Sequence, residues 1–172
     1  VPEGHYYQDV RFLDGTMYKD EQIDLLVGGS PCQSFSVIGK RGGLEDTRGT
    51  LFYEYARIVK ECQPKAFIYE NVLGMLNHDK GKTWETINNV FQSLNYNIKL
   101  FKLDAKNYGI PQDRRRIFVV GSKIENKMDI PAELDLNTTI ADYLEDVIPV
   151  KYYLGRKGFE FVTNPFYFNR AK

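Results

Sequence analysis

The stretch IDLLVGGSPCQ (residues 23–33) passes from a run of mainly apolar residues into a turn that contains glycine and proline. Residues 23–27 stop at Gly28, which is typical of a short strand buried in a sheet. Pro31 restricts the residue before it and fixes the approach of the backbone to Cys32. The pattern predicts a strand that delivers a cysteine to a stiff turn.

The rest of the sequence alternates between strand-like and helix-like patterns. Short apolar runs predict strands at 66–69, 98–101 and 115–120. Apolar residues at helical spacing predict helices over 51–62, from an N-cap at Thr83 to Leu94, and over 140–147. This alternation predicts an α/β fold in which helices cover both faces of a sheet. In such sheets, functional residues gather at the carboxyl ends of the strands.

The composition narrows the class of protein. The 172 residues carry 23 basic and 23 acidic side chains, which suits one compact domain and excludes a polybasic tail protein, although a locally basic face is compatible with it. No apolar run approaches the roughly 18 residues of a membrane span, and no signal-peptide pattern opens the sequence. Two cysteines, Cys32 and Cys62, cannot form a disulfide framework, so we expect a cytoplasmic protein. The cysteines and the two histidines lack ligand spacing, so no metal is expected.

Three segments carry candidate reactive side chains, and each has an ordinary structural alternative. Cys32 in its stiff turn is a candidate nucleophile, although most free cysteines are small buried hydrophobes. Glu70 ends an apolar strand, where loss of water favours a carboxyl group that shares a proton; the alternative is an exposed glutamate at the start of a helix. Strand alternation points Arg114 and Arg116 one way and Arg115 the other, unless all three form a solvated cluster on an edge strand.

Taken together, these segments resemble the motif series of the cytosine-C5 DNA methyltransferases. The matching motifs are PCQ at 31–33, ENV at 70–72 and QDRRR at 112–116, in the family's order and at its usual separations. Residues 40–59 are similar to the family's active-site loop and the helix after it, and 108–112 to the lead-in to its arginine motif. The resemblance covers roughly residues 9 to 150. It implies a Rossmann-like methyltransferase sheet that uses S-adenosylmethionine.

The resemblance also implies a mechanism. Cys32 would add covalently to carbon 6 of a cytosine flipped out of the duplex, which activates carbon 5 toward a methyl group. Glu70 would hydrogen-bond the ring at N3 and the exocyclic amine. Arg116 would contact the O2 atom, with Arg114 close by.

Further residues take roles only through this resemblance. Substrate binding would involve Pro31, Gln33, Ser36, Asn71 and Val72. Contacts to S-adenosylmethionine would involve Asp9, Val10, Gly29, Pro31 and Leu51. The family's main cofactor-binding unit, a first strand, glycine loop and helix, has no counterpart upstream of Asp9, so we expect an incomplete sheet.

The expected domain organisation follows the same comparison. Residues 1–149 would form part of a catalytic domain, and 150–172 would begin a target-recognition region that is either a second unit or a strand-rich excursion. The substrate would be double-stranded DNA, and the intact enzyme would be monomeric. We expect the chain to be a fragment, or one part of a split enzyme with a complementary chain, and to be inactive alone.

Three other functions remain open. A tRNA cytosine-C5 methyltransferase shares the PCQ and ENV groups, and a non-catalytic DNA-binding homologue is a second alternative. The latter usually lacks the nucleophile or the carboxylate, which are both present here. A cysteine hydrolase that pairs Cys32 with His78 or His5 is the third, but the group that would orient the histidine is not evident.

Overall fold

The computed structural model describes residues 9–31, 51–124 and 129–168. Contacts between Cα atoms divide the chain into two compact units, Val1–Asn137 and Thr138–Lys172. The first unit contains the sheet and the candidate site. The boundary expected at 149/150 between a catalytic and a recognition region stays a prediction.

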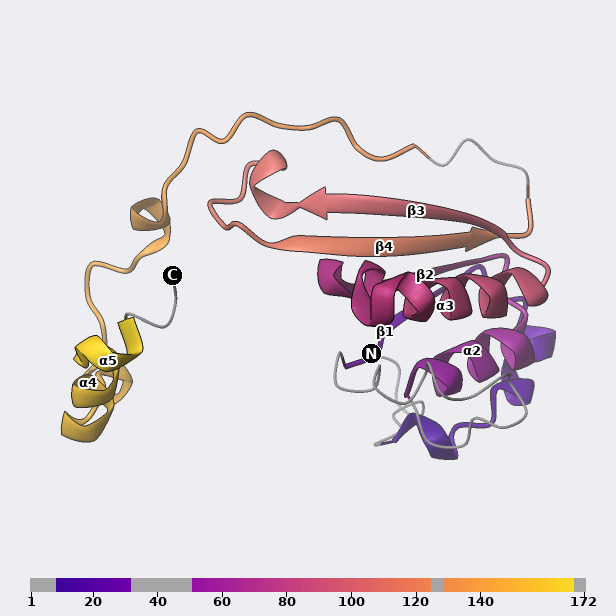
Figure 1. The fold of residues 1–172 in the computed structure, drawn as a ribbon, viewed down its shortest axis with the longest axis horizontal. Helices are drawn as coiled ribbons and strands as arrows, with labels where there is room; N and C mark the ends of the chain where they lie inside the picture. The colour runs from indigo at the N-terminus through magenta and orange to yellow at the C-terminus, as the bar shows by residue number, and fades with distance from the viewer. Residues whose placement is uncertain (1–8, 32–50, 125–128, 169–172) are drawn as a thin grey trace. The chain divides into compact units, whose positions relative to one another are not determined.

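The first unit is built on a four-stranded mixed sheet (Figure 1). Its strands are β1 (Leu25–Gly29), β2 (Ala66–Val72), β3 (Asn97–Asp104) and β4 (Arg115–Ser122), in the order β1-β2-β4-β3. Strand β1 runs parallel to β2, whereas β4 is antiparallel to both β2 and β3. All four strands predicted from the sequence are confirmed. The carboxyl ends of β1 and β2 lie side by side because Gly29 is the register partner of Glu70.

Two amphipathic helices cover one face of this sheet, α2 (Leu51–Cys62) and α3 (Lys82–Ser93). Both contact the face that carries Phe67 and Tyr69, because Phe91 of α3 and Tyr55 of α2 pack on these rings. Helices were expected on both faces, but α2 and α3 share one. The alternation along β2 places its aromatic rings on that face and Glu70 on the other.

A cluster of buried aromatic rings holds the helices to the sheet. The rings of Phe67 and Phe91 lie 4.6 Å apart, and those of Phe52 and Tyr69 lie 5.7 Å apart at a steep angle. Such offset and edge-on pairs contribute about 0.5–1.5 kcal/mol each beyond the area that they bury. Gly121 of β4 makes room for this packing, since a Cβ there would lie 2.1 Å from the Phe67 ring. The strands whose ends carry the candidate site are therefore held in place by closely packed aromatic side chains.

Several short 3-10 helices precede or connect these elements. They are η1 (Val10–Phe12), η2 (Gly15–Glu21), η4 (Leu73–Leu76), η5 (His78–Gly81) and η6 (Ala105–Asn107). The N-cap expected at Thr83 is wrong, because α3 begins at Lys82 after Gly81, whose φ of 89° suits glycine. Thr83 is fully buried inside the first turn, and its hydroxyl lies 2.7 Å from Nδ1 of His78.

The second unit differs from the sequence expectation. The helix expected over 140–147 is wrong: only η7 (Ile140–Tyr143) forms, and Leu144 is already extended. Residues Ile140 and Leu144 are about 64–65% exposed, so the apolar stripe has no packing to support a longer helix. The strand-rich alternative is also wrong for the described part, which contains η8 (Val150–Tyr152), α4 (Arg156–Thr163) and α5 (Pro165–Phe168). Among the described residues, no helix is long and apolar enough to cross a membrane.

Candidate active site

A charged pair joins the ends of two neighbouring strands. Glu70, near the end of β2, forms an ion pair of 2.9 Å with Nε of Arg116, the second residue of β4. Their side chains are 41% and 23% exposed. The sequence predicted a Glu70 carboxyl group shielded from water, but the structure gives it a half-open position beside a guanidinium. Two of the predicted catalytic residues are thus brought together.

Gly29 lies directly against this pair. A Cβ at Gly29 would lie 2.7 Å from the backbone oxygen of Glu70 and 3.3 Å from its Oε2. Since backbone cannot move aside cheaply, any side chain at this position would disturb the pairing of β1 with β2 at Glu70. The sequence assigned Gly29 to the cofactor through resemblance, and the structure shows this separate steric reason for glycine.

A buried polar network connects the turn after β1 to the end of β2. The hydroxyl groups of Tyr69 and Ser30 lie 2.6 Å apart. The Asn71 amide donates to the Ser30 carbonyl oxygen at 2.9 Å and to the Tyr69 hydroxyl at 3.0 Å. Tyr69 is fully buried and Asn71 is 3% exposed. This network fixes the backbone two residues before Cys32 in the sequence.

The sequence analysis missed Tyr69 and Ser30 and assigned Asn71 to substrate binding. The alternation of buried residues along 66–72 was the available signal, since it places Tyr69 and Asn71 on the same face. The polar side-chain atoms of Asn71 form hydrogen bonds within the protein, since its Oδ1 also accepts from the N–H of Val72 at 2.8 Å. Val72 itself is the register partner of Arg116.

The predicted nucleophile lies outside the described residues. Cys32, Gln33 and Ser36 all fall there, as does most of the segment that resembles the active-site loop. Pro31 is the last described residue of the turn and is exposed. Leu51, where the chain is described again, opens α2. The structure therefore supplies both flanks of the predicted catalytic turn.

The start of β4 is organised by Asp104 at the end of β3. Its carboxylate accepts from the backbone N–H groups of Arg114 at 3.1 Å and Lys106 at 3.4 Å, and pairs with Nε of Arg115 at 3.3 Å. Burial works to raise the pKa of Asp104, but these two backbone hydrogen bonds lower it on balance. Arg115 and Arg116 reach different partners, as strand alternation predicts, and Arg114 is exposed.

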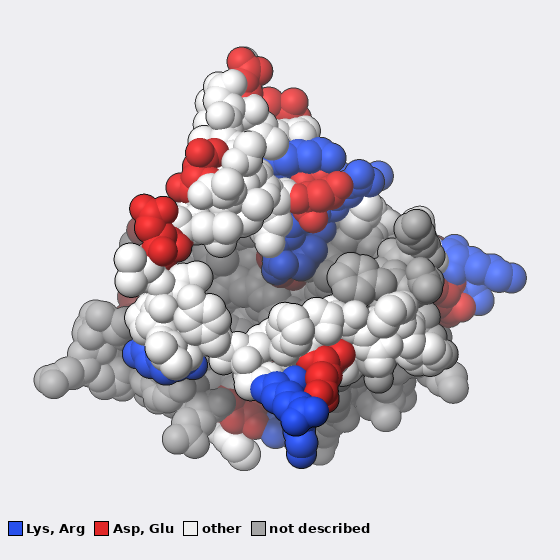
Figure 2. Space-filling view, turned by 90° about the vertical axis from the view of Figure 1, so that its left-hand side faces the viewer, with Lys and Arg blue, Asp and Glu red and all other residues white. Residues whose placement is uncertain are grey.

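A small open cavity lies at the same end of the sheet. Its volume is about 230 Å³, and its lining includes Lys102, Lys106, Arg115 and Arg116. Asp104 lies among them and pairs with two of these cations. Figure 2 shows Lys and Arg side chains interspersed with Asp and Glu side chains on the face that it presents.

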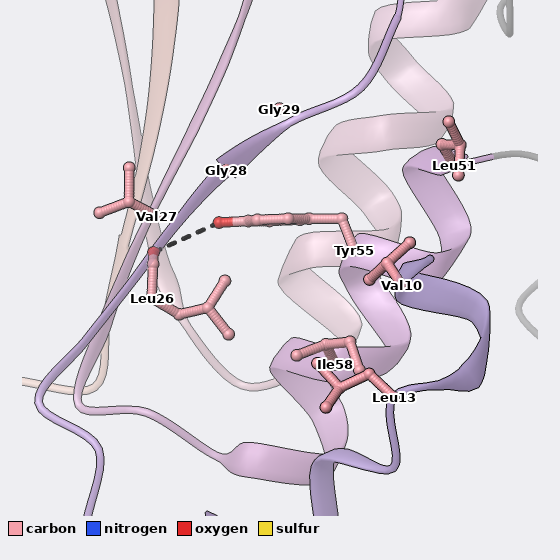
Figure 3. Close-up of a pocket in the computed structure, with 9 residues that line it drawn as sticks. All are labelled: Val10, Leu13, Leu26, Val27, Gly28, Gly29, Leu51, Tyr55 and Ile58. Carbon is pink, nitrogen blue, oxygen red and sulfur yellow. Dashed lines mark hydrogen bonds between the residues drawn. The ribbon is translucent and has the colours of Figure 1, made fainter. Parts of the chain in front are cut away.

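A second, apolar cavity of about 340 Å³ lies between β1, α2 and η1 (Figure 3). It brings together three of the residues predicted to contact the cofactor. The lining consists of Val10, Leu13, Leu26, Val27, Gly28, Gly29, Leu51, Tyr55 and Ile58. Of the other predicted cofactor residues, Pro31 is not part of the lining. Asp9 is the N-cap of η1, and hydrogen bonds from Arg11 lower the pKa of Asp9 to about 2.

Tyr55 forms the floor of this cavity and was not among the predicted site residues. Its ring extends from α2 toward β1, and its hydroxyl donates to the carbonyl oxygens of Ile68 at 2.9 Å and Leu26 at 3.4 Å (Figure 3). Gly28 permits this approach, because a Cβ there would lie 2.8 Å from the ring. The paired glycines at 28–29 were the sequence signal for both close contacts.

The described residues bear on two of the other chemistries considered. Among them, no cluster of three His, Cys, Asp or Glu side chains could hold a metal ion. His78, one of the two candidate bases of a cysteine hydrolase, has its Nδ1 within 2.7 Å of the Thr83 hydroxyl on α3.

The fold and the site define an α/β protein whose strand ends carry a carboxylate–guanidinium pair next to an apolar cavity. Functional residues are expected at such an edge. Residues 3–162 match the family model described as C-5 cytosine-specific DNA methylase, and the chain belongs to this family.

Curated relatives agree with this family. Type II methyltransferase M.HpaII of Haemophilus parainfluenzae is 47% identical over 154 residues, which cover 86% of this chain and 43% of that protein. Type II methyltransferase M1.ScrFI of Lactococcus lactis subsp. cremoris is 46% identical over 139 residues, which cover 78% of this chain and 36% of that protein. The chain thus spans less than half the length of these relatives.

A solved structure supports the fold. The S. pombe Dnmt2 methyltransferase superposes with a TM-score of 0.63, over 93% of this chain and 51% of that one. Its sequence identity is 17%, so this likeness concerns the fold alone. The predicted Rossmann-like methyltransferase fold is confirmed.

Proposed function

We propose that the protein transfers a methyl group to carbon 5 of a cytosine flipped out of double-stranded DNA. The observation that carries this proposal is the Glu70–Arg116 ion pair, which lies beside the turn that leads into Cys32. Membership of the C-5 cytosine-specific DNA methylases supports the reaction class.

The residues divide the reaction into easier steps. Carbon 5 of cytosine is a weak nucleophile, and addition of the Cys32 thiolate to carbon 6 forms an S–C bond and moves electron density to carbon 5. Glu70 hydrogen-bonds N3 and the exocyclic amine, and Arg116 donates to O2, so that charge on the ring is stabilised. Carbon 5 would then take the methyl group, and the donor would leave as the neutral thioether S-adenosylhomocysteine. Loss of the carbon 5 proton to solvent then breaks the S–C bond and restores the thiolate.

The apolar cavity fits the methyl donor of this family. S-adenosylmethionine, when bound, supplies the electrophilic methyl group. Val10 and Leu51 offer apolar side chains against which an adenine ring can pack, and Gly29, which also lines the cavity, lies directly against Glu70. Asp9 is the N-cap of η1, the short helix that contributes Val10 to the cavity lining. The absence of the family's main cofactor-binding unit stays a prediction.

DNA contacts are assigned on the same basis. Pro31, Gln33, Ser36 and Val72 would line the pocket of the flipped base, with Arg114 near the base or its phosphate. Asn71 would act through Ser30, whose carbonyl oxygen it binds. The relatives' description as type II methyltransferases supports a role in a restriction–modification system. The monomeric state and the cytoplasmic location stay predictions.

Covalent trapping tests the proposal. A duplex that contains 5-fluorocytosine cannot lose the substituent at carbon 5, so methyl transfer should leave a stable protein–DNA adduct on Cys32. We expect the adduct in the wild type and in Cys62→Ala, and none in Cys32→Ala. A methylating wild type that forms no adduct would contradict the covalent mechanism.

Two arms of the experiment separate the alternatives. A tRNA substrate that is methylated in preference to DNA would favour the RNA enzyme, and DNA binding without methylation would favour a non-catalytic homologue. The same assay is run on these 172 residues alone and on a full-length relative such as M.HpaII. The comparison measures whether the chain is inactive by itself.

A further inference from the structure

Arg57 of α2 holds the segment that forms one wall of the apolar cavity. Its Nη1 donates to the Leu13 carbonyl oxygen at 2.8 Å, and its Nη2 donates to the Val10 carbonyl oxygen at 3.0 Å. Both residues line the cavity, whereas Arg57 does not. One guanidinium therefore fixes both ends of the short backbone turn that presents these two side chains.

Two carboxylates on the same helix hold the guanidinium in place. Glu54 accepts from its Nε at 2.8 Å and Glu61 from its Nη1 at 2.7 Å. Glu61 also accepts from the N–H of Gly15 at 2.8 Å, just beyond the same segment. The residues at 54, 57 and 61 share one helix face by their spacing. The Arg57 guanidinium is thus held in one orientation by Glu54 and Glu61 before any ligand binds.

The charge of Arg57 is secured in this setting. Its side chain is only 30% exposed, and this burial works to lower its pKa, but the hydrogen bonds and charges of Glu61 and Glu54 raise the pKa on balance. Charge-assisted hydrogen bonds of this kind are stronger than neutral ones.

We propose that Arg57 is a positioning residue for the methyl donor, which acts by holding Val10 and Leu13 in place as a wall of the cavity. This inference rests on the proposed function, because it takes the cavity to be the S-adenosylmethionine site. It goes further in assigning part of the cofactor affinity to a side chain outside the cavity. The DNA site lies at other residues and should be unaffected.

The test uses Arg57→Lys as its main variant. Lysine keeps the charge between the two carboxylates but cannot reach both carbonyl oxygens with fixed geometry. Arg57→Met removes both contacts. The matched control is Lys60→Met, which removes a cation from an exposed position on the same helix. Binding of S-adenosylhomocysteine is measured by calorimetry, alongside KM for S-adenosylmethionine, KM for DNA, kcat and Tm, in the protein at its native length.

We expect Arg57→Lys to weaken binding of S-adenosylhomocysteine and raise KM for S-adenosylmethionine by roughly tenfold, the effect of about one charge-assisted hydrogen bond. KM for DNA and kcat should stay within about twofold, and Lys60→Met should match the wild type. Arg57→Met should weaken binding further, with a lower Tm.

Other outcomes overturn the inference. Unchanged S-adenosylhomocysteine binding in Arg57→Lys, with a wild type that binds it, removes the positioning role and leaves the proposed function intact. A parallel loss of DNA and cofactor affinity with a lowered Tm in Arg57→Lys shows a general structural role instead. A wild type that neither binds S-adenosylhomocysteine nor transfers methyl groups overturns the proposed function, and the inference falls with it.

Discussion

The carboxylate of Glu70 pairs with Nε of Arg116 at 2.9 Å, although the register partner of Glu70 across the strands is Phe118. The contact is therefore a diagonal one between neighbouring strands, on the sheet face opposite the two helices. The pairing of β2 with β4 therefore places the Glu70 carboxylate and the Arg116 guanidinium side by side, each on a regular strand.

Glu70→Gln should reduce methyl transfer more than binding. The amide keeps the shape of the side chain but loses the charge that stabilises the ring as the thiolate adds, so kcat should fall by roughly a hundredfold or more. Steady-state kinetics with a cytosine-containing duplex measures this. Glu85→Gln, at an exposed position on α3, is the control and should keep wild-type kcat. Equal activity in the two variants would remove Glu70 from catalysis.

Tyr69→Phe should lower kcat although no contact to substrate is proposed for it. Loss of the hydroxyl leaves Ser30 without that 2.6 Å partner and loosens the backbone before Cys32, which should lower kcat by about tenfold and stability by about 1–2 kcal/mol. Tyr96→Phe is the matched control, because its equally buried hydroxyl donates to Pro64 at 2.6 Å away from the site. Both variants should lose stability in thermal unfolding, and a similar loss of kcat in both would contradict a positioning role.

The two cysteines should differ in reactivity. Cys62 is 5% exposed, and burial raises the pKa of its thiol, so it stays protonated and shielded at neutral pH. Iodoacetamide should therefore label Cys32 first, with mass spectrometry of the peptides as the readout. Cys62→Ala should leave the labelling rate of the native protein unchanged. Preferential labelling of Cys62 in the folded protein would contradict this assignment.

Asp104→Asn should destabilise the protein at neutral pH but not in acid. The folded-state pKa of Asp104 is lowered, so its contribution to the free energy of unfolding is present above the ordinary aspartate value of about 3.9 and is lost as the pH falls below it. The difference in Tm between wild type and Asp104→Asn should therefore shrink between pH 6 and pH 3. Asp20→Asn, which removes a carboxylate at an exposed position in η2, is the control variant.

The sequence predicted the strands and the helix at 51–62 because their apolar patterns match the burial that packing enforces. It could not predict that β4 lies between β2 and β3, because strand order depends on pairing between segments far apart in the chain. The apolar spacing over 140–147 wrongly predicts a helix for a related reason. Such spacing indicates a stable helix only where another surface buries the apolar side chains.

The candidate site was predictable where a motif supplies a charged side chain. The motifs single out Glu70 and Arg116, whose side chains form the 2.9 Å ion pair. Arg57 and Tyr55 are not singled out, because their roles consist of hydrogen bonds to backbone carbonyl oxygens of distant segments. Tyr69 is missed because its hydroxyl bonds the side chains of Ser30 and Asn71 inside the protein. An arginine on a helix looks the same in sequence whether its guanidinium meets water or two carbonyl oxygens.

Tyr55 has one further consequence, for protein engineering. The same ring contacts Tyr69 in the aromatic cluster, at a centroid distance of 5.1 Å, and forms the floor of the apolar cavity. Directed evolution toward heat resistance that repacks this ring would therefore alter the shape of the cavity as a by-product, and libraries that enlarge the cavity would lose thermal tolerance.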